Sequence, residues 1–228
     1  VPPEGYFKKI YDICKKNEII FIADEVVTGF GRLGHFFSSE EIFGVVPDII
    51  TCAKGITSGY LPLGAVLFSD KLIADLKNDS SLFFHGYTYS GHPACCAAAL
   101  KNIEILKRDK ILEHVREIEP YFFEKLNKLY ELPIVGDIRG KGMMAGIECV
   151  INKDSKEALV LDKAIGSRID EESIKLGLII RPLYHICVLS PALIINRSQI
   201  DELTEKLYQA ISNTIDQLQT EGLWSQHK

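Results

Sequence analysis

The sequence lacks the cysteine spacings that hold metal ions or disulfide frameworks. None of its six cysteines forms a C-x-x-C pair, and none lies in a cluster of cysteine and histidine with the spacing of a zinc site. We therefore expect a cytoplasmic protein with buried, reduced thiols and no metal. The cysteines are Cys14, Cys52, Cys95, Cys96, Cys149 and Cys187.

Long apolar runs and basic blocks are also missing. No apolar run approaches the ~18 residues of a membrane-spanning helix, and the formal net charge is -5. Nucleic acids and membranes are therefore not expected as partners. The chain begins VPPEG, with neither an initiator methionine nor a signal-peptide pattern, so we expect it to be part of a longer protein.

What is present is an ordinary globular composition, with 46% hydrophobic and 25% charged residues in a chain of 228. In the first half, helical patterns alternate with short apolar runs at Ile19–Ala23, Ile49–Ala53 and Leu63–Phe68. This alternation predicts an α/β domain whose parallel strands are buried on both faces. We place this domain at residues 1–107 and a smaller α+β domain at residues 108–228.

Helical periodicity predicts the longer helices. Small residues indicate a tightly packed helix at Ala94–Leu106, and the next helix has its apolar face at Ile111–Leu129, where Pro120 should kink or restart it. A helix is expected at about Ser155–Lys175, and the last one should begin at Ser198, with an acidic residue three positions later as in a capping box. Short strands are expected at Met143–Val150 and around Ile179–Arg181 and Ile186–Val188.

Asp24 and Lys54 stand where two of the predicted strands end. In open α/β sheets, ligands bind at the carboxyl ends of the strands. An acid and an amine at two such ends can converge on one ligand, or they can form a structural ion pair. By themselves the two residues leave both interpretations open.

The residues around both positions resemble the signature segments of one enzyme family. Asp24–Arg32 reads DEVVTGFGR, Thr51–Gly55 reads TCAKG and Ser58–Ala65 reads SGYLPLGA. These segments resemble class III (fold type I) pyridoxal-phosphate aminotransferases of the omega-amino acid:pyruvate type. The resemblance runs from about Val1 to Leu218 and covers only the C-terminal part of a family member. It implies part of the large cofactor-binding domain, with a mostly parallel sheet and flanking helices, followed by a small C-terminal domain.

The resemblance implies roles for individual residues. Asp24 would lie beside the pyridine nitrogen and keep it protonated, because a carboxylate favours the cation. Lys54 would form the Schiff base with pyridoxal 5'-phosphate and, once released, move the substrate's proton. Val26 would pack on the cofactor ring, although a plain core valine is the alternative. Val27 stands where many members have a glutamine that reaches the cofactor's phenolic oxygen.

Two further segments resemble the family. His85–Pro93 reads HGYTYSGHP, and the resemblance implies that Thr88 contacts the phosphate of the neighbouring subunit's cofactor, in a homodimer with shared active sites. A turn and helix cap is the alternative for Thr88. Arg181 matches the arginine that holds the substrate carboxylate, which a guanidinium can bind through two parallel hydrogen bonds. The family often has Gly-Asp at positions 184–185, where this chain has Tyr-His, so a structural arginine is the alternative.

A glycine-rich pattern in the same region points to a different class of protein. Residues 29–34 read GFGRLG and satisfy G-x-G-x-x-G. The tight strand-turn-helix of a dinucleotide site is missing, however, and the next strand ends in Lys54 instead of the acid that would bind a ribose. A nucleotide-binding α/β protein is therefore the weaker alternative. Structural roles are expected for Glu25, Arg32, His85 and His92.

The resemblance implies a transaminase that moves an amino group from an omega-amino acid or amine to a keto acid such as pyruvate, by a ping-pong mechanism. In the family, the half not represented here supplies the phosphate cup, the aromatic ring stacked on the cofactor and most of the dimer surface. A truncated non-catalytic fragment, or one half of a split aminotransferase, therefore stays open as an alternative. Diaminopelargonate-, GABA- and ornithine-type specificities and aminomutases stay open as well.

Overall fold

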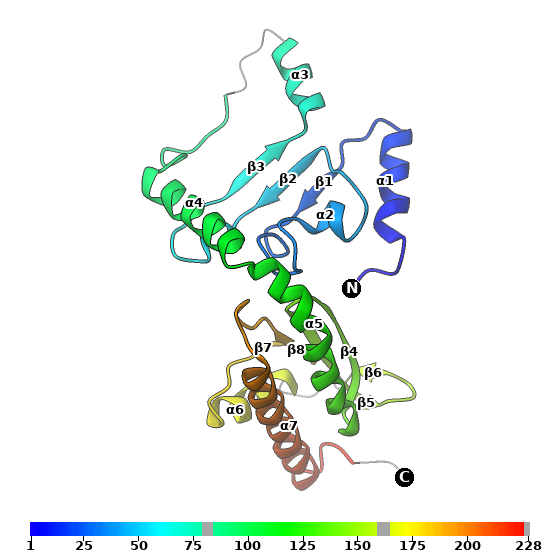
Figure 1. Cartoon of the computed structure of the whole chain (residues 1–228). Helices are drawn as coiled ribbons and strands as arrows, with labels where there is room; N and C mark the ends of the chain where they lie inside the picture. Colours follow the sequence, from blue (N-terminus) through cyan, green and yellow to red (C-terminus); the bar gives the residue numbers. More distant parts are fainter. Residues whose placement is uncertain (79–83, 159–164, 226–228) are drawn as a thin grey trace. The chain divides into compact units, whose positions relative to one another are not determined.

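The computed structural model describes residues 1–78, 84–158 and 165–225, and it divides into two compact units, Pro2–Val115 and Arg116–Lys228 (Figure 1). The division falls inside helix α5 (Ile111–Asn127). The domain boundary predicted between residues 107 and 108 stays a prediction.

Three short strands form the sheet of the first unit. They are β1 (Ile22–Asp24), β2 (Ile49–Cys52) and β3 (Ala65–Phe68), in the spatial order β1-β2-β3. β1 runs parallel to β2, and β3 runs antiparallel to β2. Each predicted apolar run therefore contains a strand, and each strand ends where a polar or small residue interrupts the run.

The burial predicted for the first strand is wrong within this chain. Ile20 and Ile22 are each more than half exposed, and so is Val66 on β3. Strands in parallel sheets are normally covered on both faces. Here β1 and β3 are both edge strands of a three-stranded sheet, so much of their apolar surface has no cover within the unit.

The helices of the first unit are α1 (Tyr6–Lys16), α2 (Ser38–Glu41), α3 (Asp70–Asn78) and α4 (Pro93–Arg108). α4 confirms the predicted small-residue helix and packs against the 3-10 turn η1 (Lys54–Thr57). Its contact face includes Cys95 and Ala99, both buried. Because small side chains allow a helix to approach a backbone segment closely, α4 lies directly against the turn that begins with Lys54.

An antiparallel sheet organises the second unit. It consists of β4 (Val135–Lys141), β5 (Met144–Asn152), β8 (Ile186–Leu189) and β7 (Arg181–Leu183), in that order, and the short β6 (Glu157–Ala158) pairs with β5. β4 was not predicted because its sequence is rich in glycine. Gly140 is required there, since a Cβ atom would overlap the Met144 carbonyl oxygen.

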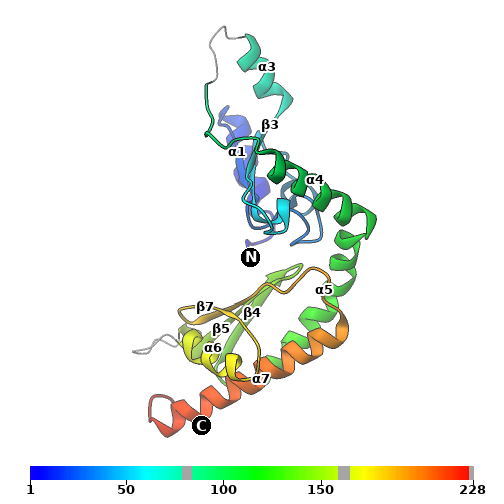
Figure 2. The same ribbon diagram turned by 90° about the vertical axis from the view of Figure 1, so that its left-hand side faces the viewer.

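The continuation of α5 and the helix α7 (Arg197–Thr220) lie on one face of this sheet, as Figures 1 and 2 both show. Pro120 lies within α5, which does not restart there. The core between these helices and the sheet is apolar and fully buried. Its largest fully buried side chains include Phe122, Leu126, Leu129, Ile147, Ile169, Ile200, Leu207 and Ile211.

Two helix starts differ from the prediction. The helix expected from Ser155 is α6 (Ile165–Lys175), because the Asn152 side chain accepts hydrogen bonds from the amides of residues 154 and 155 and turns the chain into β6. Residues 159–164 lie outside the described part. The cap of α7 is Asn196, which forms a capping box with Gln199, and Ser198 is already inside the helix.

The six cysteines are free thiols, four of them buried. In residues 1–78, 84–158 and 165–225 no helix has the length and hydropathy needed to cross a membrane. The same described segments contain no group of three histidine, cysteine or carboxylate side chains placed to hold a metal ion.

Candidate active site

The first unit brings Asp24 and Lys54 to the same edge of its sheet. Asp24 is the last residue of β1 and stands opposite Thr51 on the parallel strand β2. The Glu25 amide donates to the Thr51 carbonyl oxygen at 2.8 Å, which holds the two strand ends together. Lys54 follows β2 after one intervening residue. Since neighbouring strands lie ~4.8 Å apart, a carboxylate and an amine project from adjacent strand ends.

Both side chains are available to a ligand. Asp24 is exposed, and its carboxylate accepts a hydrogen bond from the Val26 amide at 3.0 Å. Lys54 is exposed as well, and within the described chain its amine has no hydrogen-bond or ion-pair partner. The structural ion pair left open by the sequence is not formed. The two groups fit a ligand with a cationic ring nitrogen at one end and an electrophilic carbon at the other.

The backbone around Lys54 is bent into an unusual conformation. Lys54 has a φ of 43° and Ser58 a φ of 53°, both in the left-handed region that non-glycine residues rarely adopt. Asn102 on α4 stabilises the turn, because its side-chain amide donates to the carbonyl oxygens of Gly55 at 2.8 Å and Ile56 at 3.1 Å. The sequence pattern did not indicate this role, because Asn102 is one of several polar residues in the second half of α4.

The segments after β1 and β2 pack directly against each other at glycines. A Cβ atom at Gly55 would lie 3.0 Å from the Phe30 Cβ atom and 3.1 Å from the Gly29 carbonyl oxygen. At Gly29, a Cβ atom would lie 2.8 Å from the Glu25 carbonyl oxygen. The glycines in both signature segments therefore permit the close approach that fixes the loop after Asp24 against the loop after Lys54.

Glu25 organises the loop between β1 and α2. It is 2% exposed, and its carboxylate accepts hydrogen bonds from the Ser38 amide at 2.9 Å, the Ser38 hydroxyl at 2.7 Å, the Ser39 amide at 2.7 Å and the Thr28 hydroxyl. Burial raises the pKa of Glu25, but the four hydrogen bonds lower it more, so its pKa lies below the ordinary value. Glu25 therefore has a structural role next to Asp24, as expected.

The glycine-rich stretch 29–34 belongs to the same loop and has the geometry of a turn. Gly31 and Gly34 have φ angles of 100° and 82°, and the Gly34 amide donates to the Gly31 carbonyl oxygen at 2.9 Å. The helix that follows, α2, has only four residues and begins at Ser38. The strand-turn-helix of a dinucleotide site is absent here, which removes the support for the nucleotide-binding alternative.

The remaining predicted residues lie in three places. Val26 is partly exposed and directly follows the Asp24 strand, and the neighbouring Val27 is exposed. Thr88 lies in an exposed turn before α4, where the Tyr87 amide donates to the Ser90 hydroxyl oxygen at 2.8 Å. Arg181 is the first residue of β7 in the second unit and is exposed. The structure thus brings together Asp24, Val26 and Lys54, and it leaves the positions of Thr88 and Arg181 relative to them as predictions.

Comparison with known proteins decides the family. A family model described as aminotransferase class-III matches residues 1–211. The chain belongs to the class III aminotransferases. This class III chain is 45% identical over 204 residues to the putrescine--pyruvate aminotransferase of Pseudomonas aeruginosa, a match that covers 89% of the chain and 44% of the relative.

Solved structures agree with this assignment. An (S)-enantioselective omega-transaminase from Thermomicrobium roseum matches with a TM-score of 0.89 and 41% identity, over 95% of this chain and 48% of that one. An amine transaminase from an uncultivated Pseudomonas species, solved with PLP bound, matches with a TM-score of 0.88 and 38% identity, over 94% and 49%. The class III chain has the α/β fold of these transaminases and spans about half the length of the relatives it matches.

Proposed function

We propose that this class III chain carries the lysine, the aspartate and the small domain of a pyridoxal-phosphate transaminase. Residues 1–107 would be part of the large cofactor-binding domain, and residues 108–228 the small domain. The observation that carries the proposal is the pair of exposed side chains, Asp24 and Lys54, at the carboxyl ends of adjacent parallel strands, with no ion pair between them. Pyridoxal 5'-phosphate would supply an electron sink at the carbon that loses or gains a proton.

Each side chain has a defined task in this proposal. The Asp24 carboxylate holds a proton on the pyridine nitrogen, because a nearby negative charge favours the cation. The Nζ atom of Lys54 would hold the cofactor, and as a free amine it would move the proton at the substrate carbon. Val26 packs against the cofactor ring. Thr88 reaches the phosphate of a cofactor in the neighbouring subunit, which makes the active enzyme a homodimer with shared sites.

We propose an omega-amino acid or amine as donor and a keto acid such as pyruvate as acceptor. The match to a putrescine--pyruvate aminotransferase supports this pair. Arg181 would bind the carboxylate of the acceptor through its guanidinium. The half of the family fold not represented in the chain would come from a further polypeptide segment, in the same or another chain. We place the enzyme in the cytoplasm, consistent with its free thiols.

Covalent trapping tests the proposal without requiring turnover. The 228-residue chain is incubated with pyridoxal 5'-phosphate, reduced with borohydride and mapped by mass spectrometry. Before reduction we expect a visible absorbance band, which borohydride should abolish, and after reduction we expect modification at Lys54; both signals should be absent in Lys54→Ala. Lys9→Ala, which removes an exposed lysine from α1, should leave both unchanged.

A second sample contains the same chain together with the other half of a class III relative. It separates an incomplete cofactor site from a wrong assignment, because the added half restores what the chain does not carry. If Lys54 stays unmodified in both samples, the proposed function is wrong.

A further inference from the structure

One face of the second unit's sheet collects charged residues from strands that are distant in sequence. Residues paired across an antiparallel sheet share a face. The strand register therefore places two cross-strand rows on one face. The first row is Arg139, Gly146, Val188 and Arg181, and the second is Asp137, Glu148, Ile186 and Leu183.

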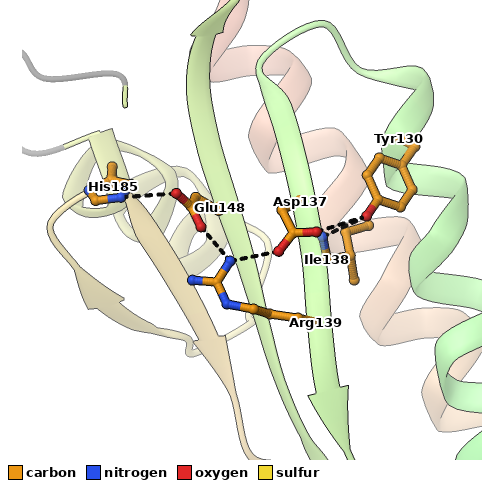
Figure 3. A network of polar contacts seen from close by, with 6 residues as sticks. All are labelled: Tyr130, Asp137, Ile138, Arg139, Glu148 and His185. Atoms are coloured by element: carbon orange, nitrogen blue, oxygen red, sulfur yellow. Dashed lines mark hydrogen bonds and ion pairs between the residues drawn. The ribbon is translucent and has the colours of Figure 1, made fainter. Parts of the chain in front are cut away.

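The charges on this face alternate in sign along a connected network (Figure 3). The Arg139 guanidinium donates to Asp137 at 2.7 Å and to Glu148. The other oxygen of Glu148 lies 3.4 Å from Nε2 of His185. At the far end, the Tyr130 hydroxyl accepts a hydrogen bond from the Ile138 amide at 2.8 Å and lies beside Asp137.

His185 is in the two-residue turn that joins β7 to β8, the hairpin that carries Arg181. Tyr184, the other turn residue, has a φ of 53°, a conformation that a glycine would adopt without strain. The carbonyl oxygens of the turn accept hydrogen bonds from Cys149 at 2.8 Å and Gly166 at 2.9 Å. The only side-chain link between the turn and the network, among the described residues, is the contact of His185 with Glu148.

The strand β7 itself is weakly held. It has three residues, it forms an edge of the sheet, and Pro182 offers no amide hydrogen. Arg181, at its start, is exposed, and no side chain in the described segments pairs with its guanidinium. The position of Arg181 therefore depends on what fixes the hairpin.

We propose that His185 is a positioning residue for Arg181. Its imidazole pairs with Glu148 and ties the β7–β8 turn to β5, in addition to the backbone pairing of β8 with β5, which helps to fix the strand that presents the substrate-binding guanidinium. This inference rests on the proposed function in one respect, the role of Arg181 in binding a carboxylate. The fastening of the hairpin is independent of that role.

The attachment should depend on pH. The contact is an ion pair only while the imidazole is protonated. The ionisable groups that face His185 are Glu148 on β5 and, through it, Arg139 and Asp137 on β4. On α6, which packs against β7 and β8, Arg168 forms an ion pair with Glu221. The Asp170 side chain, also on α6, interacts electrostatically with the buried thiol of Cys187. Fastening should therefore weaken when the imidazole loses its proton.

Amide exchange of the 228-residue chain, without cofactor, tests the fastening directly. After correction for intrinsic rates, the Leu183 and Ile186 amides should exchange about two- to fivefold faster in His185→Gln than in wild type at pH 6, which is the range expected for a partly exposed ion pair. His185→Lys, which keeps its charge at pH 8, should show protection at both pH values.

A matched control removes another histidine–glutamate pair of the chain. His35 lies 3.8 Å from Glu41 in the first unit, and His35→Gln should leave the hairpin amides as in wild type. If His185→Gln and wild type exchange equally at pH 6, or if His35→Gln changes the hairpin as much, the proposal is overturned.

The link to Arg181 is tested on the active transaminase. In His185→Gln, the KM for pyruvate at pH 6 should rise about two- to fivefold, with kcat and the KM for the amino donor unchanged. An unchanged KM for pyruvate, with faster hairpin exchange, overturns the positioning of Arg181. The exchange experiment uses neither cofactor nor substrate, so a failure of the proposed function leaves its result unchanged, whereas the KM experiment tests the part of the proposal that rests on that function.

Discussion

Glu25 shows how one buried charge shapes the loop beside the candidate active site. Its four hydrogen bonds tie the end of β1 to the start of α2, thirteen and fourteen residues later. A buried carboxylate is destabilised by the loss of hydration and stabilised by hydrogen-bond donors. For Glu25 the hydrogen bonds have the larger effect, so its pKa is lowered. The sequence shows an acid next to Asp24, but only the folded loop distinguishes the acid that is available to a ligand from the acid that is already saturated.

Glu25→Gln should lower the free energy of unfolding at pH 7 by about 1–2 kcal/mol, because charge-assisted hydrogen bonds become neutral ones. The folded pKa of Glu25 is depressed, so its contribution is present above the unfolded pKa of about 4.3 and is lost as pH falls through the folded pKa. Urea unfolding of variant and wild type between pH 7 and pH 3 measures the difference, which should shrink on acidification.

Glu124→Gln is the control for this variant, because Glu124 is exposed on α5 and should change stability by less than about 0.5 kcal/mol. A loss in Glu25→Gln that is constant over the whole pH range would contradict the assignment of the effect to the Glu25 charge.

At the scale of elements, the start of α7 tests the structure against the sequence. The sequence pattern placed the cap at Ser198, whereas the structure places it at Asn196, whose side chain accepts the Gln199 amide at 3.0 Å while the Gln199 side chain accepts the Asn196 amide at 3.0 Å. Asn196→Ala should therefore lower the free energy of unfolding by about 1 kcal/mol, the usual loss for a helix cap.

The matched variant Ser198→Ala should change the free energy of unfolding by no more than a few tenths of a kcal/mol, because alanine is a better helix former than serine. Thermal or urea unfolding of the two variants decides between the two caps. Equal losses, or a larger loss in Ser198→Ala, would contradict the capping box at Asn196.

At the scale of the whole molecule, the first unit leaves more apolar surface exposed than a stable α/β sheet normally does. Ile20, Ile22 and Val66 are all more than half exposed on or next to the edge strands. Exposed apolar edge strands pair readily with other chains. The class III relatives are about twice as long as this chain, and the proposed second half of the fold would cover such a surface.

We expect the isolated chain to associate as its concentration rises, measured by sedimentation velocity. Ile22→Lys should reduce the association, because a charged side chain on an edge strand opposes pairing. Ile174→Lys is the matched control, since Ile174 has the same 57% exposure as Ile22 but lies on α6 in the second unit. Equal effects of the two variants would show that added charge alone, and not the β1 edge, controls the association.

Local patterns in the sequence predicted the elements that depend on local interactions. Apolar runs located the strands that end at Asp24 and Lys54, and helical spacing located α4, α5 and α7. Local reasoning failed where a nearby side chain diverted the backbone, as Asn152 does before β6. It also missed β4, where glycines with low strand propensity are required by the close approach of β5.

By itself, the sequence determined which residues are candidates for the chemistry and which family the chain belongs to, because residue type and position at a strand end are local properties and the signature segments specify a family. Only the tertiary structure decided which of these residues meet. Asn102 supports the turn of Lys54 across 47 residues of sequence, and strand register places Arg139, Glu148 and Arg181 on one face. Such contacts depend on chain closure and pairing between distant segments, and these are set by packing that no local pattern records.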